Sequence, residues 1–276
     1  MSLPDILQQI VATKKSEVAA AKIRLSEAEL RGRVASGVAG PPRNFFAALT
    51  REPEGLVHII AEVKKASPSV GVMKADFDPV AIARQYYAAG ADALSVLTDE
   101  KYFGGKLEYI AAVKEAVPLP VLRKDFIIDP YQVWEARAAG ADAILLIAEI
   151  LTDSLLIDLQ ILAAELRLTT LIEVHEMDSL LRVRSTIGFP LRSYSLLGIN
   201  NRDLRTFKTD LGTTLRLAEL VEDKQILVAE SGIRDKADVQ RMTAAGVRSL
   251  LIGETLMRSG DVGETMANLK GIFRKV

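Results

Sequence analysis

The sequence predicts a single (β/α)8 TIM barrel of the phosphate-binding type, residues 1–276, with a helical extension over residues 1–45. A phrase that joins a helix to a strand recurs along the chain: Ala-Ala-Gly-Ala-Asp stands at 88–92 and at 138–142, with a weaker copy at 244–248. A glycine here suits the left-handed end of a helix, and the aliphatic run after it suits a buried strand. Repeated joints of this kind indicate a parallel sheet with crossover helices, and eight strand-like runs favour closure into a barrel.

In chain order, the first element is the extension. Residues 3–30 are rich in Ala, Lys and Glu and predict one or two amphipathic helices, while residues 36–42 predict a linker. Acidic and basic residues interleave along the helical part. We therefore interpret it as packed on the barrel, with Lys14 and Lys15 on a solvated face.

Eight strands follow, alternating with helices. The strands are expected at 57–63, 92–98, 120–123, 142–148, 170–174, 195–200, 226–230 and 249–253. Helical patterns fill the gaps, for example at 79–89, 130–139 and 211–221. The first two helices carry Pro near their start, which is a preferred first-turn position. No GxGxxG motif follows the first strand, which weighs against a dinucleotide-binding fold.

Composition excludes several classes of function. Lys plus Arg total 35 and Asp plus Glu total 36, so no net field draws the chain to nucleic acid. There is no cysteine, which excludes disulfides, thiolate nucleophiles and sulfur-based zinc sites. The longest apolar runs, such as 143–148, are too short to span a bilayer, and charged residues interrupt the N-terminal segment where a signal peptide would be apolar. The expected setting is cytoplasmic, without a membrane or nucleic-acid partner.

Charged residues occupy positions that should face the barrel lumen. Side chains alternate across a strand, so Ile60, Glu62 and Lys64 share one face of the first strand. A mutual ion pair would explain that strand alone, but polar residues recur at the ends of four more strands. These residues are Lys124, Glu173, Asn200 and the pair Glu230-Ser231. Active sites of this fold lie at that rim, so a functional site is predicted there.

Two short glycine-containing segments follow the last two strands. Ser231-Gly232 comes after the seventh strand, and Gly253-Glu254 comes after the eighth and precedes a short helix expected at 255–257. Glycine lets a backbone approach a ligand closely, and a helix N-terminus presents free N–H donors to an anion. Barrels commonly hold phosphate at these two loops, so the sequence predicts a phosphate site.

Together these motifs resemble the indole-3-glycerol-phosphate synthase family over nearly the whole chain. The segments are Ile-Ala-Glu-Val-Lys-Lys-Ala-Ser-Pro-Ser at 60–69, Leu-Arg-Lys-Asp-Phe at 122–126, Leu-Ile-Glu-Val-His at 171–175, Gly-Ile-Asn-Asn-Arg-Asp-Leu at 198–204, Ala-Glu-Ser-Gly at 229–232 and Leu-Ile-Gly-Glu at 251–254. Six motifs in this order are far more specific than any one of them. The resemblance implies a carboxy-lyase of tryptophan biosynthesis. Its substrate, 1-(2-carboxyphenylamino)-1-deoxyribulose 5-phosphate, undergoes ring closure and loses carbon dioxide and water to give indole-3-glycerol phosphate.

The resemblance also implies a role for each site residue. Lys124 is the general acid at the keto oxygen, and Glu173 assists loss of the hydroxyl. Glu62 and Lys64 are active-site partners, and Lys64 also reaches toward the phosphate. Asn200 and Ser231 orient the reacting groups. The substrate-binding residues are Ser67, Phe103, Phe126 and Arg202 on the aromatic and carboxylate side, with Gly232, Gly253 and Glu254 at the phosphate.

The chemistry agrees with these residue types. Ring closure needs an acid at the carbonyl, and a lysine ammonium can serve. Closure creates an iminium, which is itself the electron sink for decarboxylation, so neither a cofactor nor a metal is expected. A carboxylic acid beside the departing hydroxyl can protonate it if its pKa is raised.

Several other residues carry weaker expectations. Lys106 stands where the family usually has a small hydroxyl residue, and residues 187–194 form an unusually long joint at the opposite end of the barrel. His58 and Trp134 are expected to be packing residues, and His175 a rim residue with a positioning role. Residues 66–77 are long enough for a mobile lid, with Lys65 and Lys74 solvated at its ends.

Two other functions stay open from the residues alone. One is a sugar-phosphate isomerase or epimerase on the same phosphate-binding barrel, which would not need Lys124 and Glu173 together. The other is a non-catalytic barrel used for binding or scaffolding, which would not keep a complete polar rim. The sequence fixes neither the oligomeric state nor association with other tryptophan-pathway enzymes.

Overall fold

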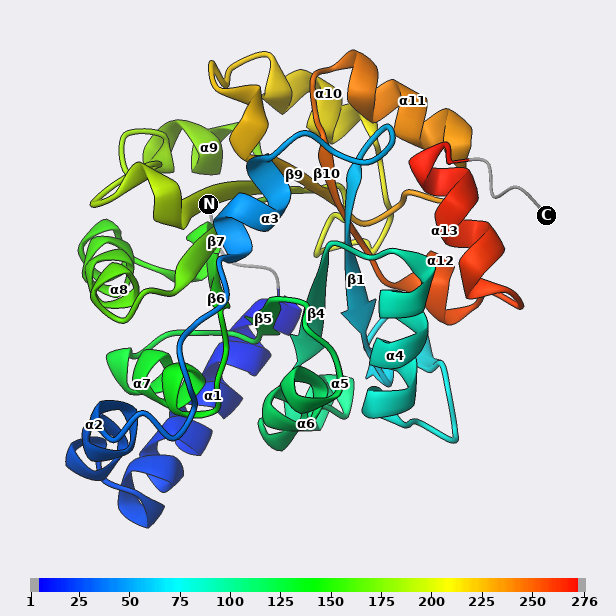
Figure 1. Cartoon of the computed structure of the whole chain (residues 1–276). Coiled ribbons are helices and arrows are strands. Elements are labelled where there is room, and N and C mark those ends of the chain that lie inside the picture. Colours follow the sequence, from blue (N-terminus) through cyan, green and yellow to red (C-terminus); the bar gives the residue numbers. More distant parts are fainter. Residues whose placement is uncertain (1–4, 273–276) are drawn as a thin grey trace.

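The computed structural model describes residues 5–272 as a closed barrel of parallel strands wrapped by helices (Figure 1). Neighbouring strands follow the order β1-β10-β9-β8-β7-β6-β5-β4, and β1 pairs with both β10 and β4 to close the barrel. The strands are β1 His58–Val63, β4 Ala93–Leu97, β5 Val121–Lys124, β6 Ala143–Ile147, β7 Thr169–Val174, β8 Ser195–Asn200, β9 Leu227–Glu230 and β10 Ser249–Ile252. The predicted (β/α)8 barrel is confirmed, and every predicted strand ends within one residue of its observed bounds.

The helices cover the outside of the barrel. They are α1 Asp5–Arg24, α2 Glu27–Ala35, α3 Phe45–Thr50, α4 Pro79–Ala89, α5 Glu100–Phe103, α6 Glu108–Ala116, α7 Pro130–Ala138, α8 Asp153–Glu165, α9 Met177–Val183, α10 Gly212–Ala218, α11 Lys236–Ala244, α12 Glu254–Met257 and α13 Val262–Lys270, with 3-10 turns η1 Ala148–Ile150, η2 Arg192–Tyr194 and η3 Lys224–Ile226. Helix α10 is shorter than predicted, because Leu220 and Val221 donate hydrogen bonds to carbonyls three residues back instead of four.

The loop after β1 holds an element that the sequence pattern did not indicate. Residues Ala66–Ser67 form β2 and Gly71–Val72 form β3, and the two strands pair as a small antiparallel hairpin. The hairpin occupies part of the segment predicted to be a lid. Lys74 is exposed beyond it, as expected, and Lys65 is half-buried.

The repeated Ala-Ala-Gly-Ala-Asp phrase has a structural explanation. Its glycines, Gly90 and Gly140, have φ values of 93° and 91°, which is the left-handed helix end that the phrase predicts. The aspartate that follows is buried and bonds to the preceding strand of the barrel. Asp92 accepts the Ile59 backbone N–H at 2.9 Å, and Asp142 accepts that of Val121 at 2.8 Å. Each phrase therefore ends one helix and fixes the start of one strand against its neighbour.

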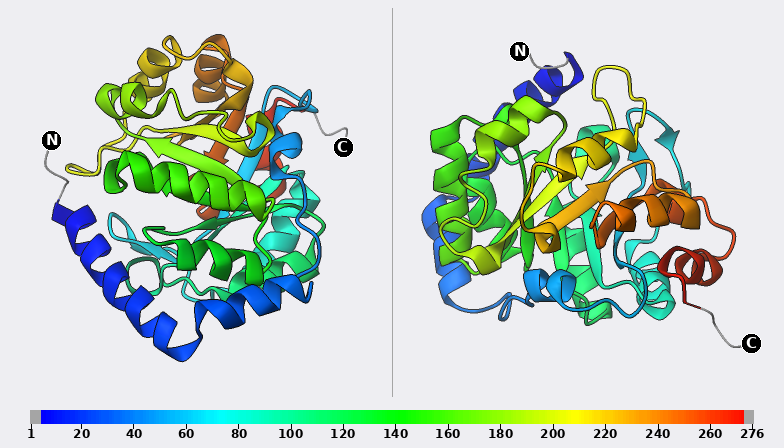
Figure 2. Two further views of the ribbon diagram at one scale, coloured as in Figure 1. Left: turned by 90° about the vertical axis from the view of Figure 1, so that its left-hand side faces the viewer. Right: turned by 90° about the horizontal axis from the view of Figure 1, so that it is seen from above.

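The N-terminal extension packs on α7. Val18 and Leu30 form a small buried cluster with Tyr131, whose hydroxyl donates to the Leu25 carbonyl at 2.9 Å. Trp134 packs against this cluster, which confirms its predicted packing role. Figure 2 shows α1 as a long dark-blue helix at the edge of the molecule that turns into α2. Across residues 5–272, no helix combines the length and apolar character needed to cross a bilayer.

Candidate active site

One pocket at the carboxyl ends of the strands contains every residue that the sequence nominates for the site. Barrel strands, the loops after them and α1 all contribute to its wall, and α1 supplies Ile6, Leu7 and Ile10. The nominated residues in the wall are Glu62, Lys64, Ser67, Phe103, Lys124, Phe126, Glu173, Asn200, Arg202, Ser231, Gly232, Gly253 and Glu254. The prediction that alternating strand residues meet at one rim of the barrel is therefore confirmed.

Lys124 lies at the centre of a group of carboxylates. Its Nζ is 3.3 Å from Glu173 Oε2 and 3.1 Å from Glu230 Oε2, so strands β5, β7 and β9 meet at this ammonium. Only 14% of the Lys124 side chain is exposed, and the two glutamates are more deeply buried. The Asn200 side chain also hydrogen-bonds to Glu173, which fixes the carboxylate from β8.

A second ion pair enters from β1. Lys64 Nζ donates a short hydrogen bond to Glu62 Oε1, and the charge of Lys124 also acts on the Glu62 carboxylate. Gly253 on the neighbouring β10 loop leaves room for this pair, because a Cβ at that position would overlap Glu62 Oε1. The predicted Glu62–Lys64 row is thus an ion pair facing the same pocket as Lys124.

The two central glutamates have opposite pKa shifts. Burial alone would raise the pKa of Glu173, but the charges of Lys124 and His175 outweigh burial and lower it. Burial together with the charge of Glu173 raises the pKa of Glu230, although Lys124 opposes this. For Lys124, burial would lower the pKa, but Glu173, Glu230 and Glu62 together raise it. At neutral pH the cluster therefore contains a lysine ammonium, a Glu173 carboxylate and a protonated Glu230.

The apolar part of the pocket includes two aromatic rings. Phe103 at the end of α5 and Phe126 after β5 lie with ring centroids 6.0 Å apart. Arg202 after β8 reaches across the pocket mouth, where its guanidinium donates to Ser69 Oγ at 3.3 Å and lies 3.6 Å from the Glu254 carboxylate. An aromatic ring and an anionic group can therefore be accommodated in one pocket.

The loops after β9 and β10 have the features predicted for an anion site. Ser231 adopts a left-handed backbone with φ of 64°, which is uncommon outside glycine and frequent at functional sites. Gly253 is the N-cap residue of α12 and, having no side chain, makes no side-chain cap hydrogen bond to the first turn of that helix. Lys106, in contrast, is exposed and does not line the pocket.

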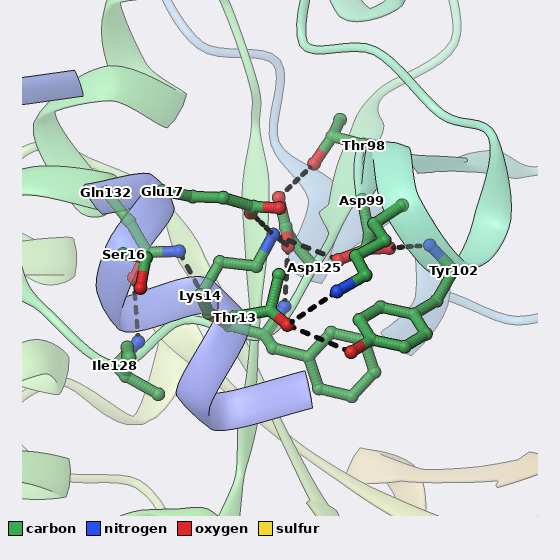
Figure 3. Close-up of polar contacts among 12 residues, drawn as sticks. Thr13, Lys14, Ser16, Glu17, Thr98, Asp99, Tyr102, Asp125, Ile128 and Gln132 are labelled. Carbon is green, nitrogen blue, oxygen red and sulfur yellow. Dashed lines mark hydrogen bonds and ion pairs between the residues drawn. The ribbon is translucent and has the colours of Figure 1, made fainter. Parts of the chain in front are cut away.

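Lys14 corrects one expectation. The sequence suggested a solvated helix face for Lys14 and Lys15, and Lys15 is exposed, but only 5% of Lys14 is exposed. Its Nζ lies 3.0 Å from Asp99 Oδ2, 2.9 Å from Asp125 Oδ1 and 2.7 Å from Glu17 Oε2, as Figure 3 shows. The charge mixing of α1 did not reveal this, because two of the partners lie far along the chain, in the segments that follow β4 and β5.

The ion pairs of Lys14 connect α1 to the pocket wall through Asp99 and Asp125. Asp125 stands between Lys124 and Phe126 and accepts the Phe126 backbone N–H at 2.8 Å. Asp99 caps α5, the helix that carries Phe103, by accepting the Tyr102 backbone N–H at 2.8 Å. One buried ammonium therefore holds α1 against both segments that carry the pocket's aromatic rings.

Comparison with known proteins agrees with this geometry. The profile of the family described as "Indole-3-glycerol phosphate synthase" matches residues 7–269. The indole-3-glycerol phosphate synthase of Acidithiobacillus ferrooxidans is 51% identical over 97% of this chain and 99% of its own length. This chain belongs to the indole-3-glycerol phosphate synthase family. The proteins of that name from Neisseria gonorrhoeae, 49% identical over 97% of this chain and 100% of that protein, and Rhodospirillum rubrum, 47% identical over 98% and 100%, support the same assignment.

Solved structures support the fold alone. A 3-hexulose-6-phosphate synthase superposes on 78% of this chain and 100% of its own with a TM-score of 0.62, at 17% sequence identity. A second protein of that name, from Salmonella typhimurium, gives the same TM-score at 14% identity and covers 78% of this chain and 97% of its own. At such low identity, the shared feature is the barrel.

One central carboxyl of this member of the indole-3-glycerol phosphate synthase family, that of Glu230, was not among the site residues expected from the sequence. Glu230 ends β9 and was expected at the rim, but nothing in the pattern distinguished it from Ser231 as the group nearest Lys124. The local signal lies on the neighbouring strand. Gly198 on β8 has no side chain, and a Cβ there would overlap Glu230 Oε1. A glycine inside a strand indicates a close approach, and here Glu230 makes it.

Proposed function

We propose that the chain closes the indole ring of 1-(2-carboxyphenylamino)-1-deoxyribulose 5-phosphate and releases carbon dioxide and water, as a carboxy-lyase. The observation that carries the proposal is the Lys124 ammonium held between Glu173 and Glu230 inside the pocket. Such a group is a positioned proton donor, and its carboxylate neighbours keep it protonated.

The order of the strands supports one orientation of this substrate. The phosphate loops follow β9 and β10, the aromatic rings follow β4 and β5, and β1 lies between these two pairs. We assign the phosphate to Gly232, Gly253 and Glu254, and the anthranilate ring to Phe103 and Phe126. Lys64, directly after β1, then stands between them, with its charge available to the phosphate.

In the first step, the ring carbon that bears the carboxylate attacks the keto carbon, and Lys124 transfers its proton to the keto oxygen. The oxygen becomes increasingly basic as negative charge develops on it, so transfer becomes favourable during bond formation. The new ring contains an iminium. The carbon–carboxylate bond then breaks, carbon dioxide leaves, and the bonding electrons neutralise the iminium.

In the second step, the hydroxyl formed from the keto oxygen leaves as water. It needs a proton, and the raised pKa of Glu230 makes that residue the donor. This differs from the role that the resemblance implies for Glu173, which is to assist loss of the hydroxyl, because the lowered pKa of Glu173 keeps it ionised. We assign to Glu173 instead the removal of the proton from the carbon beside nitrogen that completes the indole. Lys124 and Glu230 each give one proton and Glu173 takes one. The site therefore takes up one proton per turnover, which matches the loss of a carboxylate charge as neutral carbon dioxide.

The remaining assignments also stay proposals. Asn200 and Ser231 would orient the reacting groups, and Ser67 and Arg202 would contact the carboxylate side of the substrate. A cytoplasmic location and association with other enzymes of tryptophan biosynthesis are expectations that follow from the family alone.

The test is indole formation followed by fluorescence, with purified protein, the anthranilate ribulose-phosphate adduct and no added cofactor. Lys124→Ala should lower kcat by roughly 10²–10⁴. Lys106→Ala, which removes an exposed lysine outside the pocket wall, should leave kcat within about twofold. Folding of each variant is checked by circular dichroism. Absence of turnover in well-folded wild-type protein would reject the proposed reaction.

A further inference from the structure

His175 lies next to the catalytic cluster, between two carboxylates. It follows β7 directly, two residues after Glu173, and only 9% of its side chain is exposed. Nδ1 is 3.2 Å from Glu149 Oε2, and Nε2 is 3.3 Å from Glu173 Oε1. The same Glu173 carboxylate faces Lys124 through its other oxygen. The imidazole therefore occupies the side of Glu173 opposite to the reacting lysine.

Glu149 is held in place to support this imidazole. It belongs to η1, directly after β6, and its Oε1 accepts the His175 backbone N–H at 2.9 Å. The Ser179 side chain from α9 also hydrogen-bonds to Glu149. Both carboxylate oxygens thus interact with His175, and 11% of the Glu149 side chain is exposed. A carboxylate so poorly hydrated needs a positive partner, which favours the imidazolium form of His175.

Counting the charges around Glu173 identifies where a proton must reside. Three carboxyl groups, Glu149, Glu173 and Glu230, surround two cations, Lys124 and His175. Glu62 has its own partner in Lys64 and is left out of the count. In a buried group of three carboxylates and two cations, protonation of one carboxyl removes the excess negative charge and the repulsion that it causes. Glu173 contacts both cations, and Glu149 contacts His175 and has a hydroxyl donor. Of the two cations Glu230 contacts Lys124 alone, and its other partner is the Glu173 carboxyl, with which it shares a hydrogen bond.

We propose that His175, as an imidazolium supported by Glu149, is a positioning residue that keeps Glu173 ionised and thereby assigns the acid proton of the cluster to Glu230. It does not touch the substrate. Its effect passes through Glu173, whose two oxygens it and Lys124 hold from opposite sides. This inference deepens the proposed function and rests on it, because the two glutamates have different roles only in that reaction.

The carboxylates around His175 all raise its pKa. Burial on its own would lower the pKa of His175, but the hydrogen bond to Glu149 and the charges of Glu173, Glu149 and Glu230 outweigh it and raise the pKa. On the outer side, α9 contributes Glu176 and Asp178 to the hollow that also contains His175. Arg182, in the same hollow, donates hydrogen bonds to the Leu151 carbonyl and to Asp153.

The first test measures the imidazole directly in the intact enzyme without substrate. The chain has two histidines, so ¹⁵N-histidine NMR gives two sets of ring signals, each from Nδ1 and Nε2, and His58→Gln assigns them. His58 is the matched control, because it too is buried beside a carboxylate, Asp92, at 3.1 Å, but at the other end of the barrel. We expect His175 to carry both ring protons at pH 7 and to lose one only above the usual histidine pKa of about 6.5. A neutral His175 at pH 7 would overturn the proposal.

The second test is the pH dependence of kcat/KM. His175→Gln should move the acidic limb, which reports protonation of Glu173, toward neutral pH by about one to three units. Glu149→Gln should move it in the same direction, and the double variant should show no further shift, since Glu149 acts only through His175. His58→Gln should leave the limb in place. A loss of activity in His175→Gln that is equal at every pH would mean a merely structural role and would reject the proposal.

The two tests separate failure of this inference from failure of the proposed function. The NMR result does not depend on which substrate the enzyme uses. Wild-type turnover with an unshifted His175→Gln profile would refute the role of His175 and leave the reaction standing. An imidazolium at pH 7 in an enzyme that does not turn over the adduct would contradict the proposed function instead.

Discussion

At the scale of single residues, the site shows how environment differentiates two identical side chains. Glu173 and Glu230 are both buried and both contact Lys124, but Glu173 has a second cation beside it and Glu230 does not. The pKa of Glu173 is lowered to about 2 and that of Glu230 is raised to about 8. A pair of carboxyls with separated pKa values provides a base and an acid at the same pH.

Replacing Glu230 by Gln tests the acid role. Gln keeps the size and hydrogen-bonding capacity of a protonated carboxyl but cannot supply the proton, so kcat should fall by roughly 10²-fold. The wild-type kcat/KM should decline above a midpoint near pH 8, where free Glu230 loses its proton, and this alkaline limb should be absent in the variant. The pH–rate profiles of both proteins measure this.

The matched control is Glu108→Gln, which removes an exposed carboxylate on α6 outside the pocket and should reproduce the wild-type profile. An alkaline limb that persists unchanged in Glu230→Gln would show that another group supplies the proton.

The sequence predicts site residues whose position depends on one strand alone, and it misses contacts that form between residues of different strands. The lumen row of β1 follows from alternation, and so does the position of Lys124. The link between His175 and Glu149 joins two neighbouring strands through an irregular turn, η1, so no local pattern contains it. The close approach of Glu230 to Gly198 became visible only when β8 and β9 were placed side by side.

At the scale of elements, α1 is attached to the barrel by one buried cation, Lys14, and by apolar and polar contacts on either side of it. Lys14 lies between Asp99 and Asp125, whose side chains are almost completely buried. On one side of Lys14, Ile6, Leu7 and Ile10 line the pocket, and on the other, Val18 packs on α7. Thr13 adds a hydrogen bond of 2.9 Å to the Tyr102 hydroxyl. Docking of α1 and the order of the pocket wall are therefore coupled.

The variant Lys14→Met should weaken this docking. It removes the Lys14 ammonium from two buried carboxylates, of which Asp125 keeps its ion pair with Arg123 at 3.1 Å. Removing one partner of a buried ion pair costs about 3–5 kcal/mol. Urea unfolding measures the global loss of stability. Hydrogen exchange over residues 5–24 measures local release of α1, which can occur without global unfolding.

Lys15→Met is the control, because it removes the same charge from the exposed neighbouring position and should change stability by less than about 0.5 kcal/mol. If Lys14→Met matches Lys15→Met in both measurements, Lys14 does not hold the helix.

Element boundaries were the most predictable part of the fold. Strand ends follow from aliphatic runs and from the glycine–aspartate joint, both of which are local. The C-terminal end of helix α10 and the β2–β3 hairpin were not predicted, because both depend on hydrogen bonds that carry little sequence signal. The sequence interpretation of Lys14 as a solvated residue was wrong, because its partners Asp99 and Asp125 follow β4 and β5, far along the chain.

At the scale of the whole molecule, a nearly neutral protein concentrates its perturbed groups at the barrel mouth. The net charge is −1, yet the mouth holds Asp125 and Glu173 with pKa values near 2 and Glu230 with a pKa near 8. Burial alone would raise the pKa of Asp125, but the positive charges of Arg123 and Lys14 outweigh burial and lower it. Groups shifted in opposite directions make opposite contributions to the pH dependence of folding.

These shifts predict how the free energy of unfolding varies with pH. Asp125 and Glu173 have lower pKa values in the folded chain than the roughly 4 of the unfolded chain. Their contribution is therefore present above about pH 4 and is lost as the pH falls toward 2. Glu230 has a higher pKa in the folded chain than in the unfolded chain. Its contribution is complete below about pH 4 and is lost as the pH rises through 8.

Urea unfolding of the substrate-free enzyme between pH 3 and pH 9 should therefore show a decline on both sides of a maximum. Glu230→Gln removes the group that must ionise inside the folded barrel, so its stability should fall less than that of the wild type between pH 5 and pH 8. The acidic decline should be unchanged, because Asp125 and Glu173 remain. An equally steep alkaline decline in the variant would mean that burial of Glu230 does not cost the folded enzyme stability, and would contradict its assignment as the neutral acid of the site.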